Sequence, residues 1–260
     1  MRSTLLVLTA GLVAIGAVLA VRATHPGQVG AAPAMAASGA DRAGDRAALG
    51  RTIRDYLIAN PEVLVEAMQE LERKQDSQRD ATAQKGIKQY QGELLRDPDA
   101  PVDGNPAGDV TIVEFNDYQC PYCKRAHVAV KAVMASDSKV KVVYKDLPIL
   151  GEPSKIAAHA ALAAVKQGKH KVFHYALMEH NGRIDSDKIF EIAGSVGLDV
   201  AQLKKDMDDP KIKQLIERNM ALASALGVRG TPAFVIGNQF APGAVDADTL
   251  RQMIAEARKG

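Results

Sequence analysis

Hydrophobic residues follow two different patterns along this 260-residue chain, and the change between them divides it. From residue 110 onward, short β-branched runs alternate with longer stretches of helical period, which is typical of an α/β domain. Before that point, apolar residues recur at every third or fourth position, as on one face of an α-helix. These residues are Leu49, Ile53, Leu57, Leu64, Met68 and Leu71.

The helical segment is predicted to contain two helices. Asn60-Pro61-Glu62 indicates a new helix start, with Asn60 as the cap and an acid beside the positive end of the dipole. Beyond Leu71 the apolar stripe fades into a polar stretch of mixed charge. The helices could pack on the main domain, but a stripe without an obvious internal partner favours packing against copies of the chain. We therefore interpret residues 47–97 as an oligomerisation segment.

The stretch "RDPDAPVDGNPAGD" (96–109) carries three prolines and two glycines, which indicates a boundary, and a domain is expected over residues 98–260. Val110 to Phe115 and Val140 to Lys145 are predicted strands joined by a helix, which makes a parallel crossover unit. A third strand is expected from Thr231 to Gly237, followed by a short partner and a closing helix.

Between the second and third strands, residues 153–227 predict five short helices. Pro153-Ser154, Asp185-Ser186, Asp199 and Pro210 mark four of the expected helix starts, and Gly168 ends the first helix. The fold class is therefore α/β, with an inserted helical bundle and a preceding α-helical stalk.

The N-terminus predicts export. Arg2 precedes the uncharged, mostly apolar run from Leu5 to Val21, and cleavage could follow Ala23 or Ala36. The run is also nearly long enough to remain as a membrane anchor. Residues 1–36 are assigned to this signal or anchor and the start of a tether, and 37–46 to the Gly- and Ala-rich tether. Either alternative places the rest of the chain outside the cytoplasm.

Composition narrows the function in two ways. The formal net charge of +2, from 33 basic and 31 acidic residues, gives no indication of nucleic-acid binding. The chain has only two cysteines, Cys120 and Cys123, and in an oxidising compartment such thiols serve chemistry or one local loop.

A Cys-x-x-Cys pair could be a metal half-site, a structural staple or a redox centre. Zinc generally needs four ligands, and no second ligand cluster accompanies the pair, so no metal site is assigned, although two thiolates would suit cuprous ion. His170 and His174 could clasp a metal from one helix face, but we expect them to be exposed polar residues. A disulfide across two residues closes too small a loop to stabilise a fold appreciably.

The redox interpretation has positional support. The pair follows a strand and opens a helix, so Cys120 lies where free N–H groups and the helix dipole favour a thiolate. Cys120 is then the nucleophile, and Cys123, one turn deeper, resolves the mixed disulfide.

Two further sites fit this chemistry. Glu114 lies in an apolar strand, where burial would raise its pKa and let it relay a proton to the deeper thiol. The alternative is a strand-end acid facing water. Thr231-Pro232 is a candidate cis peptide that leaves backbone groups free to pair with an extended substrate, and the alternative is an ordinary trans proline.

The motifs "VEFNDYQCPYCKR", "YKDLPILGEPSKIAAHAALAA" and "GVRGTPAFVIG" resemble the DsbA-like branch of the thioredoxin superfamily over about residues 108–258. The resemblance implies a thioredoxin fold and a periplasmic thiol–disulfide oxidoreductase without a cofactor. It makes Cys120 and Cys123 catalytic, matches Glu114 to the buried acid, and assigns Thr231, Pro232 and the Pro121-Tyr122 dipeptide to substrate contact. Pro121-Tyr122 departs from the Pro-His of the best-known member, which leaves the redox potential open.

Residues 53–75 are similar to the N-terminal segment of ScsC-type proteins, the suppressor-of-copper-sensitivity group. This implies a homo-oligomer, such as a trimer, that acts as a disulfide isomerase or reductase. The implied partners are misfolded exported proteins and a membrane redox protein, either a DsbD- or ScsB-like reductant or a DsbB-like oxidant. The alternatives are a monomeric or dimeric oxidase and a copper-binding or copper-protective protein that uses the same thiols.

Overall fold

The computed structural model describes the backbone of residues 39–259 and the side chains of residues 44–259. The predicted signal or anchor and the first part of the tether lie outside these residues. No helix within the described range is both long and apolar enough to cross a membrane. Contacts divide the chain into two compact units, with the division between Val63 and Leu64.

The first unit contains α1 (Gly39–Ala59). The helix starts inside the segment 37–46 that was predicted to be a tether, because the alanines and arginines there are strong helix formers. The role of Asn60 at the C-terminal end of α1 differs from the prediction. The Asn60 side chain donates a hydrogen bond to the carbonyl of Tyr56 at 2.9 Å, so it closes the end of α1 instead of capping the next helix.

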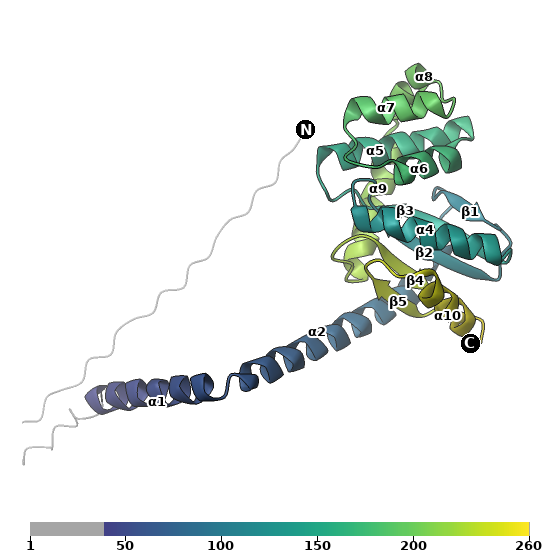
Figure 1. Cartoon of the computed structure of the whole chain (residues 1–260). Helices are drawn as coiled ribbons and strands as arrows, with labels where there is room; N and C mark the ends of the chain where they lie inside the picture. Colours follow the sequence, from purple (N-terminus) through teal and green to yellow (C-terminus); the bar gives the residue numbers. More distant parts are fainter. Residues whose placement is uncertain (1–38, 260) are drawn as a thin grey trace, which may run out of the picture. The chain divides into compact units, whose positions relative to one another are not determined.

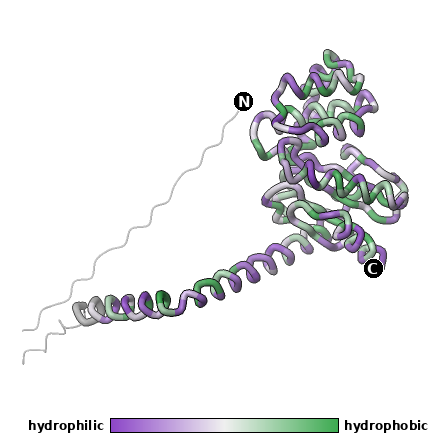
Figure 2. The backbone as a smooth tube through the Cα atoms, in the orientation of Figure 1, coloured by the Kyte–Doolittle hydropathy of each residue, from purple (hydrophilic) through white to green (hydrophobic). Residues whose placement is uncertain are grey.

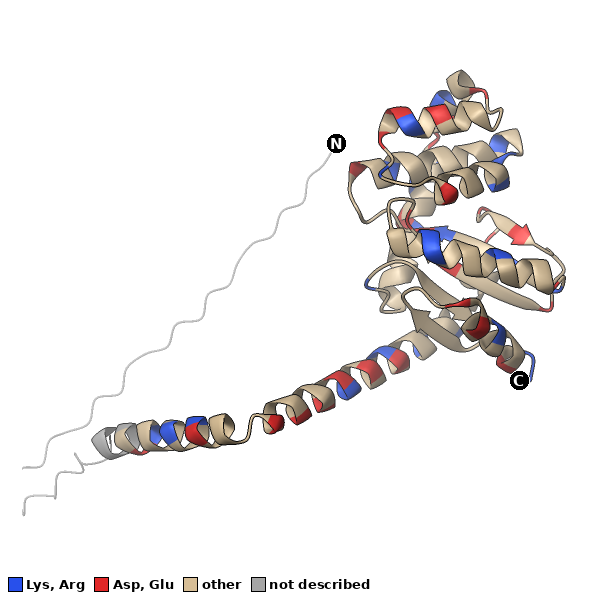
Figure 3. Cartoon of the chain, in the orientation of Figure 1, with Lys and Arg blue, Asp and Glu red and all other residues tan. Residues whose placement is uncertain are grey.

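The second helix, α2 (Glu62–Gln89), changes character along its length. Near its start the apolar side chains are exposed, including Leu64, Met68 and Leu71; Figure 2 shows hydrophobic positions recurring there, and Figure 3 shows both signs of charge further along. Near its end, Ile87 is buried and packs with Leu94 of α3 (Gln91–Leu95) in the core beside the sheet. The last turns of α2 and α3 therefore complete that core from the N-terminal side of the predicted boundary at 97/98.

The sheet has five strands in the order β1-β3-β2-β4-β5. Only β2 and β3 are parallel among the pairs of this sheet, and α4 (Pro121–Ser136) joins them as the predicted crossover unit. The strands are β1 (Val102–Gly104), β2 (Val110–Asn116), β3 (Val140–Asp146), β4 (Ala233–Ile236) and β5 (Gln239–Pro242).

Strand β1 corrects the prediction of a boundary at residues 96–109. Val102 pairs with Val143, and the short strand lies at the sheet edge, antiparallel to β3. Pro101 and Pro106 flank the strand, so neither proline interrupts its hydrogen bonds.

Helices cover both faces of the sheet. On one face, α4 and α10 (Ala247–Ala257) pack on Ile112 of β2 and its neighbours. On the other face, the end of α2, α3 and α9 (Pro210–Ala225) pack on Val113 and Phe115. This alternation along β2 decides which residues lie beneath the N-terminus of α4.

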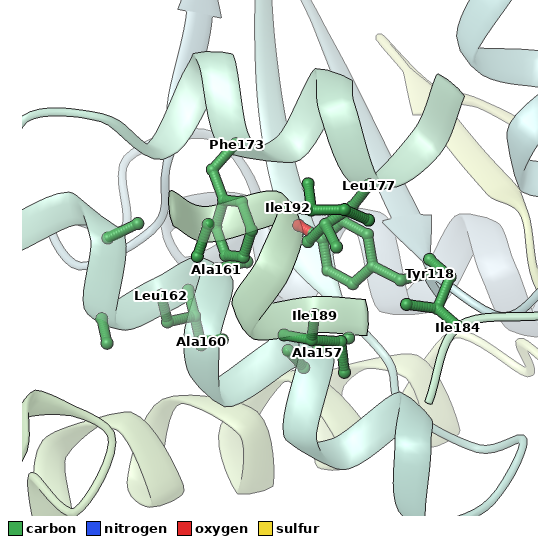
Figure 4. Packing of buried hydrophobic residues seen from close by; sticks show 14 of the residues in the cluster. Tyr118, Ala157, Ala160, Ala161, Leu162, Phe173, Leu177, Ile184, Ile189 and Ile192 are labelled. Carbon is green, nitrogen blue, oxygen red and sulfur yellow. The ribbon is translucent and has the colours of Figure 1, made fainter. Parts of the chain in front are cut away.

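The inserted bundle lies between β3 and β4, as predicted, and its helices gather together in Figure 1. Asp185, Asp199 and Asp209 cap three of its helices through their side chains. Figure 4 shows its core, in which Tyr118 points in among Leu177 and Ile184. Because Tyr118 belongs to the β2–α4 loop, it anchors that loop to the insertion. The helices are α5 (Glu152–Ala163), α6 (His170–Glu179), α7 (Ser186–Ser195), α8 (Val200–Asp206) and α9 (Pro210–Ala225), with a 3-10 turn at Ala164–Gln167.

Candidate active site

Both cysteines lie at the start of α4, the helix that follows β2. Cys120 is the N-cap residue of α4 and has extended backbone angles, and Pro121 follows in the first turn. The Cys123 side chain lies one turn further along and is fully buried, whereas Cys120 keeps 4% of its surface exposed. Both are free thiols, so the structure represents the reduced, dithiol state.

The two thiols have opposite pKa shifts. A hydrogen bond from Cys123 is the main cause that lowers the pKa of Cys120 to about 6, helped by the Thr231 side chain and the N–H groups of Cys123 and Tyr122 against the opposing effect of burial. Burial raises the pKa of Cys123, and its hydrogen bond to Cys120 adds to the rise. At neutral pH Cys120 is therefore a thiolate, and Cys123 is a thiol that holds its proton.

The loop before β4 lies against the reactive sulfur. The Thr231-Pro232 peptide is cis, as the sequence predicted. In its protonated form, the Cys120 thiol donates a hydrogen bond to the Thr231 carbonyl at 3.2 Å. The hydroxyl oxygen of Thr231 is buried without a hydrogen-bond partner, so it is free to donate to a thiolate.

Glu114 lies in the middle of β2 and is 1% exposed, which excludes the water-facing alternative. Neither carboxyl oxygen has a hydrogen-bond partner. Burial, followed by the charge of Asp146, raises the pKa of Glu114 to about 8. Glu114 also acts on the pKa of Cys123, so the acid lies within electrostatic reach of the deeper thiol.

Asp146 is a second buried acid that the sequence analysis did not identify. It lies at the end of β3, in register with Asn116, whose amide donates to it at 3.1 Å. Burial raises the pKa of Asp146 to about 7. Because Glu114 and Asn116 are two residues apart on β2, Glu114 and Asp146 share the sheet face beneath α4. Aligning the two predicted parallel strands, with Glu114 beside Tyr144 and Asn116 beside Asp146, could have revealed that Asp146 lies close to Glu114.

The dipeptide between the cysteines faces outward. Pro121 and Tyr122 are exposed, and the Arg125 guanidinium lies 4.4 Å from the centre of the Tyr122 ring. Tyr122 and Arg125 line one end of a groove of about 610 Å³ between α4 and the segment at residues 243–247. These side chains are therefore available to a bound chain rather than to the sheet.

The histidines of α6 contradict the prediction that they are exposed. His170 is 8% exposed and His174 is fully buried, because α6 packs between α4 and the rest of the insertion. His174 shares a hydrogen bond of 2.9 Å with the Tyr118 hydroxyl. Burial lowers the pKa of His170 to about 4, so it is neutral at physiological pH. No three His, Cys, Asp or Glu residues in the described range are grouped to hold a metal.

Comparison with known proteins gives two family matches. Residues 111–255 match the family model described as a DSBA-like thioredoxin domain. Residues 45–78 match the model described as the copper resistance protein ScsC N-terminal domain.

Solved structures share the fold. A thioredoxin-like oxidoreductase from Silicibacter pomeroyi is 48% identical, with a TM-score of 0.64 over 65% of this chain and 98% of that chain. A linker-deletion mutant of Proteus mirabilis ScsC is 30% identical, with a TM-score of 0.64 over 87% of this chain and 99% of that chain. The predicted thioredoxin-like fold with an N-terminal helical segment is thus confirmed.

Curated relatives match over the same domain. A probable disulfide bond formation protein D from Bacillus cereus is 28% identical over 60% of this chain and 77% of that protein. The chain spans about a quarter (26%) of a Na(+)/H(+) antiporter NhaA 1 from Salinispora arenicola, at 28% identity over 63% of this chain.

Proposed function

This chain belongs to the DsbA-like thioredoxin family, and we propose that it is an exported protein thiol–disulfide oxidoreductase that works as an oligomeric disulfide isomerase or reductase. The observation that carries the proposal is the opposite pKa shift of two adjacent thiols, one of which contacts the Thr231 carbonyl. A pair of this kind exchanges disulfides rather than stabilising a fold.

The chemistry follows from the two protonation states. The Cys120 thiolate attacks one sulfur of a substrate disulfide, that S–S bond breaks, and the other substrate sulfur leaves as a thiolate. A mixed disulfide now joins Cys120 to the substrate. Cys123 then gives its proton to Glu114 in the fraction of molecules whose Glu114, with a pKa of about 8, is ionised, and attacks Cys120, which releases the substrate as a dithiol. In isomerisation a second substrate thiolate attacks the mixed disulfide instead, and the enzyme returns to the dithiol state.

Substrate binding is assigned to the surface around Cys120. Thr231 and Pro232 border a cavity of about 380 Å³, where an extended chain can pair with the loop. On another side, Pro121 and Tyr122 present apolar surface next to the groove along α4. A substrate segment that occupies both the cavity and the groove would place its own cysteine next to the Cys120 sulfur.

The oligomer is proposed to form through α1 and the first half of α2. Leu64, Met68 and Leu71 remain at least half exposed within their unit. A row of exposed apolar side chains at helical spacing is typical of an association surface. Several active sites in one assembly would meet the same misfolded protein at high local concentration, which favours isomerisation.

The proposed location is the periplasm, reached through the N-terminal signal or anchor. The proposed partners there are misfolded exported proteins with incorrect disulfides. A membrane redox protein, either a DsbD- or ScsB-like reductant or a DsbB-like oxidant, would reset the cysteine pair.

One observation favours a second candidate, an oxidase that donates its disulfide. A Cys120 pKa of about 6 stabilises the reduced form, and a stabilised dithiol makes its disulfide a stronger oxidant. The third candidate, copper binding by Cys120 and Cys123, is suggested by the affinity of two thiolates for cuprous ion and by the description of the family at residues 45–78.

The deciding experiment measures the redox potential of the Cys120/Cys123 pair together with the mass of the protein in solution. An oligomer that refolds a protein with scrambled disulfides supports the isomerase. If the protein is a monomer at micromolar concentration and its cysteine pair has an oxidising potential, the isomerase proposal fails and the oxidase is supported. For copper, the reduced protein is titrated with cuprous ion against a strong chelator, and negligible competition removes that candidate.

A further inference from the structure

A second hollow opens beside Cys120, on the side of the inserted bundle. It has a volume of about 400 Å³ and lies between the start of α4, the β3–α5 loop and the α6–α7 loop. Two basic side chains and no acidic side chain line it. Gln119, Lys124 and Arg183 are among its lining residues.

The α6–α7 loop, which carries Arg183, is fixed by hydrogen bonds from two side chains, Lys124 and Gln119. The Lys124 ammonium donates to the carbonyls of His180 at 2.6 Å and Gly182 at 3.1 Å. The Gln119 amide accepts from the Ile184 N–H at 3.3 Å and donates to the Ile184 carbonyl. Backbone groups on both sides of Arg183 are thus tied to the residues that flank the active cysteine.

Arg183 itself is exposed and has no ion-pair or side-chain hydrogen-bond partner among the described residues. Asp185, Glu152 and Asp117 each have partners other than Arg183. Asp185 caps α7 by accepting from Lys188 at 2.8 Å, and Glu152 pairs with Lys155 at 3.2 Å. Asp117 accepts from the backbone of Ile149 and Leu150. Arg183 therefore lines the hollow beside Gln119 and Lys124, and no ion pair with an acid is formed by its guanidinium among the described residues.

We propose that Arg183 and Lys124 form an anion-accepting subsite that selects substrates carrying an acidic side chain near the reactive cysteine. This inference rests on the proposed thiol–disulfide exchange and adds its substrate preference. Arg183 presents five N–H donors, and Lys124 keeps one N–H after its two carbonyl contacts. Gln119 is a positioning residue, because it holds the loop and leaves the anion to the two cations.

The subsite acts on encounter and orientation rather than on the sulfur chemistry. Exposed charges at the edge of a binding surface mainly change the association rate and its dependence on salt. One carboxylate facing two cations is expected to raise the exchange rate about threefold to tenfold at low ionic strength. Salt of about 0.5 M would screen most of that gain.

The test uses the reduced full-length protein and three amidated peptides, each carrying one mixed disulfide. The peptides differ only in whether the positions flanking cysteine hold Glu, Gln or Lys, and amidation removes the terminal carboxylate. Second-order exchange rates give an acidic-to-neutral ratio. The expected ratio is about three or more at low salt, near one in high salt, and near one for Arg183→Gln.

The matched control is Lys213→Gln, which removes an exposed charge from α9, where its Nζ lies 3.9 Å from Glu217. This variant should keep the wild-type ratio. Equal rates for the Glu and Gln peptides, an unchanged ratio in Arg183→Gln, or an equal loss in Lys213→Gln would each overturn the subsite. Failure of the wild type to react with any peptide would instead contradict the proposed function.

Discussion

Cys120 and Thr231 lie 111 residues apart in the chain, yet the Cys120 thiol donates to the Thr231 carbonyl at 3.2 Å. The contact brings the β2–α4 junction and the loop before β4 to one point. It depends on β2 and β4 being neighbours in the sheet, with Phe115 paired to Ala233. The antiparallel pairing thus positions the nucleophile beside the loop expected to bind substrate.

The first prediction concerns the thiolate of Cys120. Its alkylation rate in the reduced protein should rise with pH around a midpoint of about 6. In Cys123→Ala the midpoint should move up by about one pH unit, because the largest cause of the lowered pKa is removed. Cys123→Ser, whose hydroxyl can still donate, is the matched control and should shift less. A low-pKa thiol at Cys123 would reverse the assigned roles.

The second prediction concerns pH and stability. Burial raises the pKa of Glu114 from 4.5 to about 8, so between these values the folded protein holds a proton that the unfolded chain has released. The stabilisation from this group is complete below pH 4.5 and is lost as the pH rises towards 8.

Chemical denaturation of Glu114→Gln from about pH 5 to pH 8 checks this. The glutamine does not titrate, so the variant should lose less stability than the wild type over this range, by an amount on the order of a few kcal/mol. Asp146→Asn, measured in parallel, gives the contribution of the second buried acid to the loss of stability with rising pH. Parallel stability curves for wild type and Glu114→Gln would contradict the buried, protonated state.

The third prediction concerns the stalk. Met68→Glu with Leu71→Glu should reduce the mass in solution to that of a monomer, because charges would enter the proposed association surface. Both side chains are more than half exposed, so the folding of the monomeric unit should be unaffected. Light scattering and circular dichroism measure the two effects. A helix-surface control, Arg73→Glu, should keep the oligomer if the apolar row alone is responsible.

The same prediction can be sharpened by truncation. Removal of residues 47–75 should convert isomerase activity into oxidase activity and leave the domain folded. Removal through residue 95 should instead lower the melting temperature strongly, because Ile87 and Leu94 fill the core beside the sheet. If isomerase activity survives the shorter deletion, the stalk is not its cause.

The fourth prediction concerns the Lys145–Asp97 ion pair, in which the Lys145 side chain is 1% exposed and the charged atoms are 2.6 Å apart. Asp97→Ala leaves a buried ammonium without its partner and should cost about 3–5 kcal/mol of unfolding free energy. Lys145→Met combined with Asp97→Leu should recover most of that loss. Urea denaturation of the single and double variants tests it, and additive losses would show that the pair is not coupled.

Much of this fold could be predicted because the signals were local. The period of apolar residues, the capping aspartates and the strand–helix position of Cys120 each depend on a few neighbours in sequence. Glu114 was recognisable because an acid within an apolar strand is unusual.

The remaining features depended on contacts between distant segments. The burial of His174 depends on α6 packing against α4, and Asp146 is meaningful only in register with Asn116. Strand β1 was hidden because three residues between prolines resemble a linker until a neighbouring strand pairs with them. In each case the deciding partner lay in a different element, far along the chain.

Complete burial of the Cys123 side chain has a chemical consequence beyond its role in exchange. A peroxide or a soluble disulfide oxidises a cysteine sulfur only when it meets the thiolate directly, and Cys123 is neither accessible nor charged. Its only partner in reaction is the sulfur of Cys120. Oxidation of the cysteine pair must therefore begin at Cys120, where Cys123 can convert a sulfenic acid to a reversible disulfide before the irreversible sulfinic and sulfonic acids form.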